Sequence, residues 1–235
     1  MTLPLDALAR QRAATASVWR ADIATRPRGD WAQLRDLVLH TTGIPVRHWN
    51  GAHVTGQEPD LPAARSWFAQ RGMPWAYLVP EELPFAPPTE LLTEQRVMLR
   101  NLEDLPPMPE LELRWDDGHG AAAVQEQAFG DELAREFVLP KLVNEACAVV
   151  TAYDGGPVST ATLVAVDGVA AVYGVGTLPT YRGRGLGRAV TLAVLHEGRR
   201  RGCDLAFLNP SELGYRVYAG LGFVDAPGWR VHAPL

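Results

Sequence analysis

The chain has 235 residues, 47% of them hydrophobic, which is enough for one large domain or two small ones with well-formed cores. Its formal net charge is −5 and its sequence pI is about 5.7, so the whole molecule does not attract polyanions, and nucleic acid is not an expected partner. Its two cysteines, Cys147 and Cys203, lack the spacing of a metal site, so the sequence indicates neither a bound metal nor a disulfide framework.

The sequence carries no signal for export or membrane insertion. Asp6 and Arg10 interrupt the apolar N-terminal residues, and nowhere do about 18 apolar residues follow one another. Lys141 is the only lysine among many arginines, which we attribute to codon bias in a GC-rich genome. We therefore expect a cytoplasmic, bacterial protein with no membrane partner.

Two proline-rich segments, residues 79–90 and 102–112, interrupt the chain. The three prolines of the second segment cannot lie inside a helix or a central strand, so this segment is the expected domain boundary. We expect an N-terminal α/β region over residues 1–108 and a second domain over residues 109–235.

The N-terminal region mixes helical and strand patterns. In chain order, we expect a helix at 5–24, a helix at 31–40, a strand at 47–56, a helix at 60–72, and strands at 74–80 and 94–103. Its aromatic residues Trp49, Trp67, Phe68 and Trp75 are interpreted as core rather than as a ligand cage.

The second domain has clearer patterns. The dipeptides Asp154-Gly155 and Asp167-Gly168 are typical of hairpin turns, Ser211 is a plausible helix N-cap, and apolar residues recur with helical spacing from Leu186 onward. In chain order, we expect a strand at 110–117, helical segments at 121–130 and 131–146, a three-strand meander at 147–179, a helix at 186–201, a strand at 203–209, a helix at 211–222 and two strands in 223–233. This order predicts an α+β fold.

The stretch TLPTYRGRGLGRAV, residues 177–190, lies between a predicted strand and a predicted helix. In this position backbone N–H groups and the positive end of a helix can hold an anion, and glycines let a ligand approach the backbone closely. A dinucleotide fingerprint would need glycine where Arg188 stands, and a phosphate-binding P-loop would need a following Gly-Lys-Ser/Thr. A glycine-rich turn that only connects strand and helix is the plain alternative.

The residues from Arg182 to Gly187 read R-G-R-G-L-G, which resembles the Q/R-x-x-G-x-G/A signature of the GNAT superfamily of N-acetyltransferases. A second feature of that family, a tyrosine shortly before a Gly-Phe pair, appears as Tyr218 before Gly222 and Phe223. The resemblance covers roughly residues 111–235. It implies a central mixed, mostly antiparallel sheet flanked by helices, with an N-terminal α/β extension that could be a degenerate partial copy of the same fold. In that case the extension would lengthen the sheet or wall the acceptor pocket.

The resemblance implies acetyl-CoA as cosubstrate, with no metal, and assigns roles to particular residues. Backbone amides of the glycine loop would hold the pyrophosphate, the loop arginines would add charge, and neighbouring strand residues would hydrogen-bond the pantetheine arm. Asn209 could contact the same arm or simply form a turn. The residues so implied are Val175, Thr177, Leu178, Arg182, Gly183, Arg184, Gly185, Leu186, Gly187, Arg188 and Asn209.

Tyr218 matches the family tyrosine that hydrogen-bonds the departing sulfur, and Tyr215 is a second candidate on the same helical face. A phenol has a pKa of about 10 against roughly 8.5 for a thiol, so stabilisation of the thiolate is favoured over full proton transfer. Each of the two tyrosines is also compatible with a purely structural place on an amphipathic helix.

No general base is assigned. Relatives often place a carboxylate on the fourth strand, but AVYGVGT, residues 171–177, contains none. Candidates that could act directly or through water are Glu126, Asp116, Asp117, Glu212 and His119, but residues of these types are more often solvated surface groups. His196 and the arginines 199–201 suit the polar side and C-terminal end of their helix, and no ligand is assigned to them.

The function that follows is acetyl transfer from acetyl-CoA to a primary amine of a small molecule or a peptide. A non-catalytic acyl-CoA-binding or regulatory protein is the alternative, favoured by the missing base. The acceptor, the oligomeric state and the length of the acyl group stay open at this level, because specificity is not a property of the fold.

Overall fold

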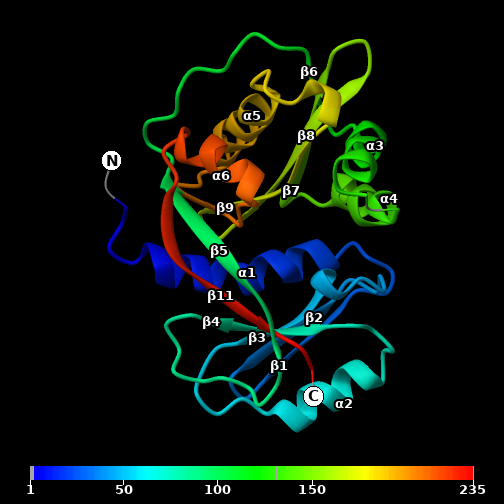
Figure 1. The fold of residues 1–235 in the computed structure, drawn as a ribbon, viewed down its shortest axis with the longest axis vertical. Coiled ribbons are helices and arrows are strands. Elements are labelled where there is room, and N and C mark those ends of the chain that lie inside the picture. Colours follow the sequence, from blue (N-terminus) through cyan, green and yellow to red (C-terminus); the bar gives the residue numbers. More distant parts are fainter. Residues whose placement is uncertain (1–2, 131, 235) are drawn as a thin grey trace. The chain divides into compact units, whose positions relative to one another are not determined.

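The computed structural model describes residues 3–130 and 132–234, and the chain divides into two compact units (Figure 1). The first unit contains the residues up to Asp22 and Met98–Val224, and the second contains Ile23–Val97 and the residues from Asp225. The domain division near residue 108 stays a prediction, and the compact units group the chain ends differently. Asp131, where the sequence predicts the start of a helical segment, lies outside the described residues.

The first unit holds a six-stranded arrangement in the order β5-β10-β9-β8-β7-β6. Neighbouring strands are antiparallel except β9 and β10, which run parallel. Its elements are α1 (Ala7–Ile23), the end of β5 (Leu91–Asn101), β6 (Leu113–Trp115), α3 (Gly118–Phe129), α4 (Ala134–Val138), η2 (Leu139–Val143), β7 (Cys147–Tyr153), β8 (Pro157–Val166), β9 (Val169–Thr177), η3 (Pro179–Tyr181), α5 (Leu186–Arg200), β10 (Leu205–Leu208) and α6 (Glu212–Ala219). The mixed, mostly antiparallel sheet flanked by helices is thus confirmed.

Helices cover both faces of this sheet because its strands alternate apolar side chains to each side. Val150 and Ala161 pack with Val190 of α5 in the main core, whereas Val149, one residue away on β7, packs with Ala121 of α3. Successive side chains of a strand point to opposite faces, so both faces need a helix to exclude water. Each buried aliphatic side chain contributes about 1.5–3 kcal/mol.

The amphipathic pattern from Leu186 produces α5, and the end of this helix is tied to β7. Glu197 accepts hydrogen bonds from Arg200 at 2.7 Å and Arg201 at 2.6 Å, and Arg201 donates to the backbone oxygen of Glu145 at 2.7 Å. Gly198 lies so close to β9 that a Cβ on it would meet the Ala170 Cβ at 2.8 Å. These contacts hold the helix, and hence its N-terminal end, against the sheet.

The second unit contains five strands in the order β1-β2-β3-β4-β11, with β3 and β4 parallel and the other pairs antiparallel. Its elements are β1 (Asp30–Leu34), β2 (Leu37–Thr41), η1 (Arg47–Trp49), β3 (Asn50–Val54), α2 (Leu61–Ala69), β4 (Ala76–Pro80), the start of β5 and β11 (Val224–His232). Asp60 caps α2 by accepting from the Ala63 amide at 3.1 Å. Among the described residues, no helix is long and apolar enough to cross a membrane.

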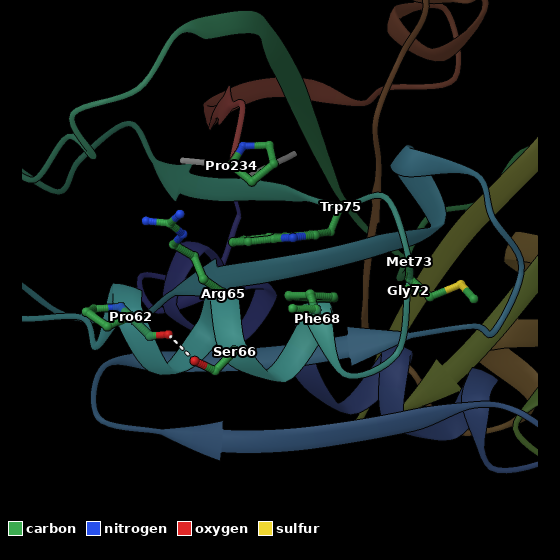
Figure 2. Close-up of a pocket in the computed structure, with 9 residues that line it drawn as sticks. Pro62, Arg65, Ser66, Phe68, Gly72, Met73, Trp75 and Pro234 are labelled. Atoms are coloured by element: carbon green, nitrogen blue, oxygen red, sulfur yellow. Dashed lines mark hydrogen bonds between the residues drawn. The ribbon is translucent and has the colours of Figure 1, made fainter.

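Phe68, Trp75 and Tyr77 belong to the core of this unit, as the sequence predicts for Phe68 and Trp75. Their rings stack at 4.3 Å between centroids and are almost fully buried. Trp49 is buried as well, whereas Trp67 is partly exposed beneath the Arg71 guanidinium. An open pocket of about 570 Å³ lies beside this stack, and Figure 2 shows Trp75 between Phe68 and the C-terminal Pro234.

Two predicted elements are wrong. Residues 31–40 form the β1–β2 hairpin rather than a helix, because Asp36 adopts a left-handed turn with φ of 54° and β2 pairs along β3. Residues 223–233 form the single strand β11 rather than two, since pairing with β4 from Trp229 to His232 keeps the backbone extended past Gly228. In both segments strand pairing overrides the local pattern, with neighbouring strands in the hairpin and with the distant strand β4 in β11.

We expect Glu197→Gln to destabilise the protein, and to do so less at low pH. Hydrogen bonds from Arg200 and Arg201 outweigh burial and lower the pKa of Glu197 from 4.5 to about 2. A lowered carboxyl pKa stabilises the folded state above the unfolded pKa, and this contribution is lost as pH falls through the folded pKa. Urea unfolding should show a loss of about 1 kcal/mol at pH 7, since solvent screens these arginines, and a shrinking difference from pH 5 to pH 2.

The matched control is Glu110→Gln, which changes an exposed residue in the segment before β6. It should leave the free energy of unfolding unchanged at both pH values. A Glu197→Gln loss that stays constant from pH 7 to pH 2 would contradict the charged hydrogen-bond network.

Candidate active site

The parallel pairing of β9 and β10 ends early and leaves one edge of β9 open. The two strands pair from Val169–Leu205 to Val172–Leu208, after which β9 continues to Thr177 beside β8 alone. From residue 173 to residue 177, no described strand lies on the other side of β9. Unpaired strand edges present N–H and C=O groups in a row, so an extended ligand can hydrogen-bond there.

A β-bulge lies in this open part of β9. Thr160 pairs with Gly176 and Thr162 with Tyr173, so two residues of β9, Gly174 and Val175, lie opposite one residue of β8. Gly174 has a φ of 57°, which favours glycine. Val175 and Leu178 pack partly against the core, and Thr177 is held by Ser159, whose hydroxyl lies 2.9 Å from the Thr177 hydroxyl. The bulge re-aims the strand where its edge opens.

Six consecutive backbone amides at the start of α5, those of residues 183–188, have no acceptor among the described residues. The bonds resume at Ala189, whose amide donates to Gly185 at 3.0 Å. No side chain caps the helix, whose N-cap is Gly185 in the left-handed region with φ of 79°. The first backbone donors of a helix need a cap, water or a ligand as acceptor. Because no described side chain caps α5, these N–H groups form a positive, exposed surface that suits an anion.

The glycines shape this loop in different ways. A Cβ at Gly183 or Gly185 would meet nothing within 4 Å, so their outer faces are open. A Cβ at Gly187 would meet the Thr177 hydroxyl at 3.3 Å, which brings the helix start close to the end of β9. The Leu186 side chain is buried in the core and anchors the loop, while its backbone amide is one of the six amides without an acceptor.

The loop arginines are exposed, and two of them contact residues near the loop. Arg182 donates to the Thr177 oxygen at 3.3 Å, and Arg184 lies over the Tyr181 ring and 3.8 Å from the Asp154 carboxylate. Arg188 lies near Arg100 of β5. Arg100 is only 3% exposed. Burial and the Arg188 charge lower the pKa of Arg100, although Asp104 raises it. Two cations brought near each other are stabilised by an anion between them.

Tyr218 lies in α6 with its ring in the main core. Its side chain is 7% exposed, its ring lies against Gly214 and packs edge-on with Phe223 at 6.1 Å, and its hydroxyl has no hydrogen bond among the described residues. Ser211 caps the helix through the Gly214 amide at 3.2 Å, as its sequence position predicts. Burial raises the pKa of Tyr218 to about 12, so the hydroxyl is a hydrogen-bond donor at neutral pH. Tyr215 is only partly buried.

The remaining polar candidates differ in their exposure and in the hydrogen bonds that they already form. Asp117 caps α3 and accepts from Tyr153, and these hydrogen bonds lower its pKa against the opposing effect of burial. His196 contacts the Pro106 oxygen at 2.8 Å. Asp116, His119 and Glu212 are exposed, and Glu126 is half-buried on α3. Asn209 directly follows β10, two residues before the α6 cap.

Sequence reasoning missed several residues that the fold places beside this site. Arg100 follows an apolar run in β5, and Gln125, Thr162 and Tyr173 lie near the bulge. Nothing in their local patterns marks them, because strand pairing places Thr162 beside Tyr173, the packing of α3 places Gln125 beside Gly174, and Arg100 comes from β5. Within residues 3–130 and 132–234, no group of three or more His, Cys, Asp or Glu side chains is placed to hold a metal ion.

Solved structures share this fold. A GCN5-related N-acetyltransferase from Kribbella flavida is similar with a TM-score of 0.72 and 21% identity, over 95% of this chain and 96% of that chain. A functionally unknown conserved protein from Staphylococcus epidermidis has a TM-score of 0.64 and 13% identity, over 87% and 92%. A GCN5-related N-acetyltransferase from Sphaerobacter thermophilus has a TM-score of 0.58 and 17% identity, over 84% and 79%. At identities this low, the structural similarity establishes the fold alone.

Family membership comes from the sequence match to a family model. No curated protein matches the chain significantly. Residues 108–223 match the acetyltransferase (GNAT) family, and this range includes the open edge of β9, the glycine loop and Tyr218. Members of this family transfer acetyl groups from acetyl-CoA. The protein therefore carries a GNAT acetyltransferase domain over residues 108–223.

Proposed function

We propose that this protein transfers an acetyl group from acetyl-CoA to a primary amine of a small molecule or a peptide, by direct attack of the amine on the thioester. The observation that carries the proposal is the run of six amides without acceptors at the start of α5. We propose a bacterial cytoplasm as its setting, supported by the reduced-type cysteine usage of the chain.

The residues present suit the pyrophosphate and pantetheine parts of the cosubstrate. The amides of Gly183 to Arg188 and the positive end of α5 would receive the pyrophosphate, in the open space above Gly183 and Gly185. Arg182, Arg184 and Arg188 would add charge beside it. The open edge of β9 from Val175 to Thr177 would hydrogen-bond the amide groups of the arm, and Asn209 would lie at its other side.

When bound, acetyl-CoA supplies an acetyl thioester, whose carbonyl carbon forms a bond with the amine nitrogen while its bond to sulfur breaks. Tyr218 would donate a hydrogen bond to the departing thiolate. With a pKa of about 12, its phenol holds its proton against a thiol of pKa roughly 8.5, so it stabilises the negative charge without giving the proton away. The proton that the amine loses then goes to solvent or to the thiolate.

A non-catalytic acyl-CoA-binding protein is the alternative, and a specific observation favours it. The open part of β9 carries no carboxylate, and Asp117 is already occupied as a helix cap. A protein that only binds the donor would keep the glycine loop and need neither Tyr218 nor a base. The two functions differ in what the loss of the Tyr218 hydroxyl does.

We expect acetyl-CoA and CoA to raise the melting temperature in a thermal-shift titration. A ligand at 100 times its Kd adds about 2.7 kcal/mol to the stability of the folded state. For a chain of this size the melting temperature should rise by roughly 5–10 °C. NADH and ATP serve as controls, because both carry phosphates without the pantetheine arm. No rise with either CoA compound would contradict the donor site.

We expect Tyr218→Phe to lower kcat by about 10- to 100-fold, because a hydrogen bond to a charged group contributes about 1.5–3 kcal/mol. The Kd for CoA should change less than twofold, since the ring and its packing against Gly214 remain. Acetyl transfer is followed by release of free thiol, and CoA binding by calorimetry.

Tyr215→Phe is the matched comparison on the same helix. A larger loss of kcat in that variant would assign the role to Tyr215. Unaltered turnover in both variants would remove the tyrosines from the mechanism, and the absence of any turnover in the wild-type protein, together with CoA binding, would support the non-catalytic alternative.

A further inference from the structure

One face of the sheet carries a cluster of polar side chains beside the bulge of β9. Thr162 of β8 pairs directly with Tyr173 of β9 and with Val149 of β7. Val149 packs against α3, and directly paired residues share a face, so Thr162 and Tyr173 also lie on the α3 face. Gln125 of α3 reaches the same place, because a Cβ on Gly174 would lie 2.6 Å from its Nε2 atom.

These three side chains lack hydrogen bonds within the described part of the chain. The Thr162 hydroxyl is buried without a partner, and the residue is 1% exposed. Gln125 is 5% exposed, and neither its carboxamide nor the Tyr173 hydroxyl bonds another described residue. Buried polar groups are almost always satisfied in folded proteins, and an unmade bond costs free energy. Of the three, the Thr162 hydroxyl is the buried group without a partner, and the Gln125 carboxamide and the partly buried Tyr173 hydroxyl lie beside it with no bond to another described residue. Together they leave hydrogen-bonding capacity for a ligand.

The cluster begins where the edge of β9 opens. Val172 is the last residue of β9 that pairs with β10, and Tyr173 is the next. A thioester arm along that edge would therefore end beside the cluster. It would lie on the opposite face from the ring of Tyr218, which belongs to α6 and packs in the core with α5. An acceptor that approaches the carbonyl from the α3 face meets these three groups.

Aromatic rings surround the polar groups. The Tyr173 ring contacts Trp19 of α1 at 6.4 Å and Phe207 of β10 at 6.2 Å between centroids. Phe129, at the end of α3, is 56% exposed and lies over Gly176. The three polar groups themselves carry no formal charge. Such a lining suits a neutral amine on an apolar skeleton better than a polycation.

We propose that Gln125, Thr162 and Tyr173 form the acceptor subsite, which holds the amino group of an apolar primary amine by hydrogen bonds. This inference rests on the proposed acetyl transfer. A neutral primary amine has two N–H groups, so two of the three side-chain oxygens accept them at a time, and the nitrogen lone pair is left directed at the thioester carbonyl. Burial raises the pKa of Tyr173, so its phenol stays neutral and positions the amine rather than removing its proton.

The experiment uses the full chain with three variants that remove one polar group each at similar volume: Tyr173→Phe, Thr162→Val and Gln125→Leu. Initial rates are measured with acetyl-CoA and a panel of 2-phenylethylamine, butylamine, spermidine and triglycine amide. Each variant should raise the KM for the best amine by about 5- to 50-fold, as expected for one lost hydrogen bond to a substrate. The Kd for acetyl-CoA should change less than twofold, and 2-phenylethylamine should exceed spermidine at least about tenfold in kcat/KM.

Stability separates this role from a structural one. Because none of the three groups bonds another residue within 3–130 and 132–234, their apolar replacements should keep or raise the Tm, whereas loss of a structural hydrogen bond would lower it. The matched control is Tyr77→Phe, which removes another buried tyrosine hydroxyl without a hydrogen bond, in β4 of the second unit. It should leave the KM for amines unchanged.

Unchanged amine KM values in Tyr173→Phe and Thr162→Val, in a protein whose wild type acetylates the panel, would overturn the subsite and leave acetyl transfer standing. Equal kcat/KM for spermidine and 2-phenylethylamine would overturn the apolar class of acceptor. A wild-type protein that binds acetyl-CoA but acetylates no amine would refute the proposed function, and the subsite with it.

Discussion

The early end of the parallel pairing between β9 and β10 is the constraint on which the rest of the site depends. Hydrogen bonds between the two strands stop at Val172 and Leu208, and α6 begins shortly after β10. Among the strands that the structure describes, β9 then continues beside β8 alone, so half of its backbone groups face away from any of them. A ligand that supplies the missing partners completes the sheet, and binding there reuses the chemistry of strand pairing.

Two kinds of unsatisfied group flank this open edge. Backbone amides without acceptors lie at the start of α5, where they favour negative charge. Side-chain groups without partners, those of Gln125, Thr162 and Tyr173, lie on the α3 face and favour a small polar group. The loop amides face open space, whereas the Thr162 hydroxyl is buried without a partner, and an unmade buried bond costs free energy in the chain alone. The proposed donor and acceptor roles follow from this difference in chemistry and place.

Rigid packing holds both sets in position. Leu186 anchors the glycine loop in the core, and Gly198 lets α5 approach β9 closely. Glu197 and Arg201 tie the far end of α5 to the segment before β7. Because the amides are fixed before any ligand arrives, little ordering free energy is spent on binding. The Tyr218 ring is fixed in the same core, so its hydroxyl is presented at a defined place.

The sequence by itself determined the elements whose signals are local: α5 with its glycine-rich start, the β7–β9 meander, the Ser211 cap and the family resemblance carried by Arg182–Gly187 and Tyr218. Turn dipeptides, caps and helical periodicity act over a few residues, so they can be read without partners. Only the tertiary structure decided that residues 31–40 form a hairpin, that β9 loses β10 after Val172, and that Gln125, Thr162 and Tyr173 meet. The hairpin depends on the turn at Asp36 and on pairing of β2 with β3, and the other two outcomes depend on strand pairing and helix packing between segments far apart in the chain, which no local pattern encodes.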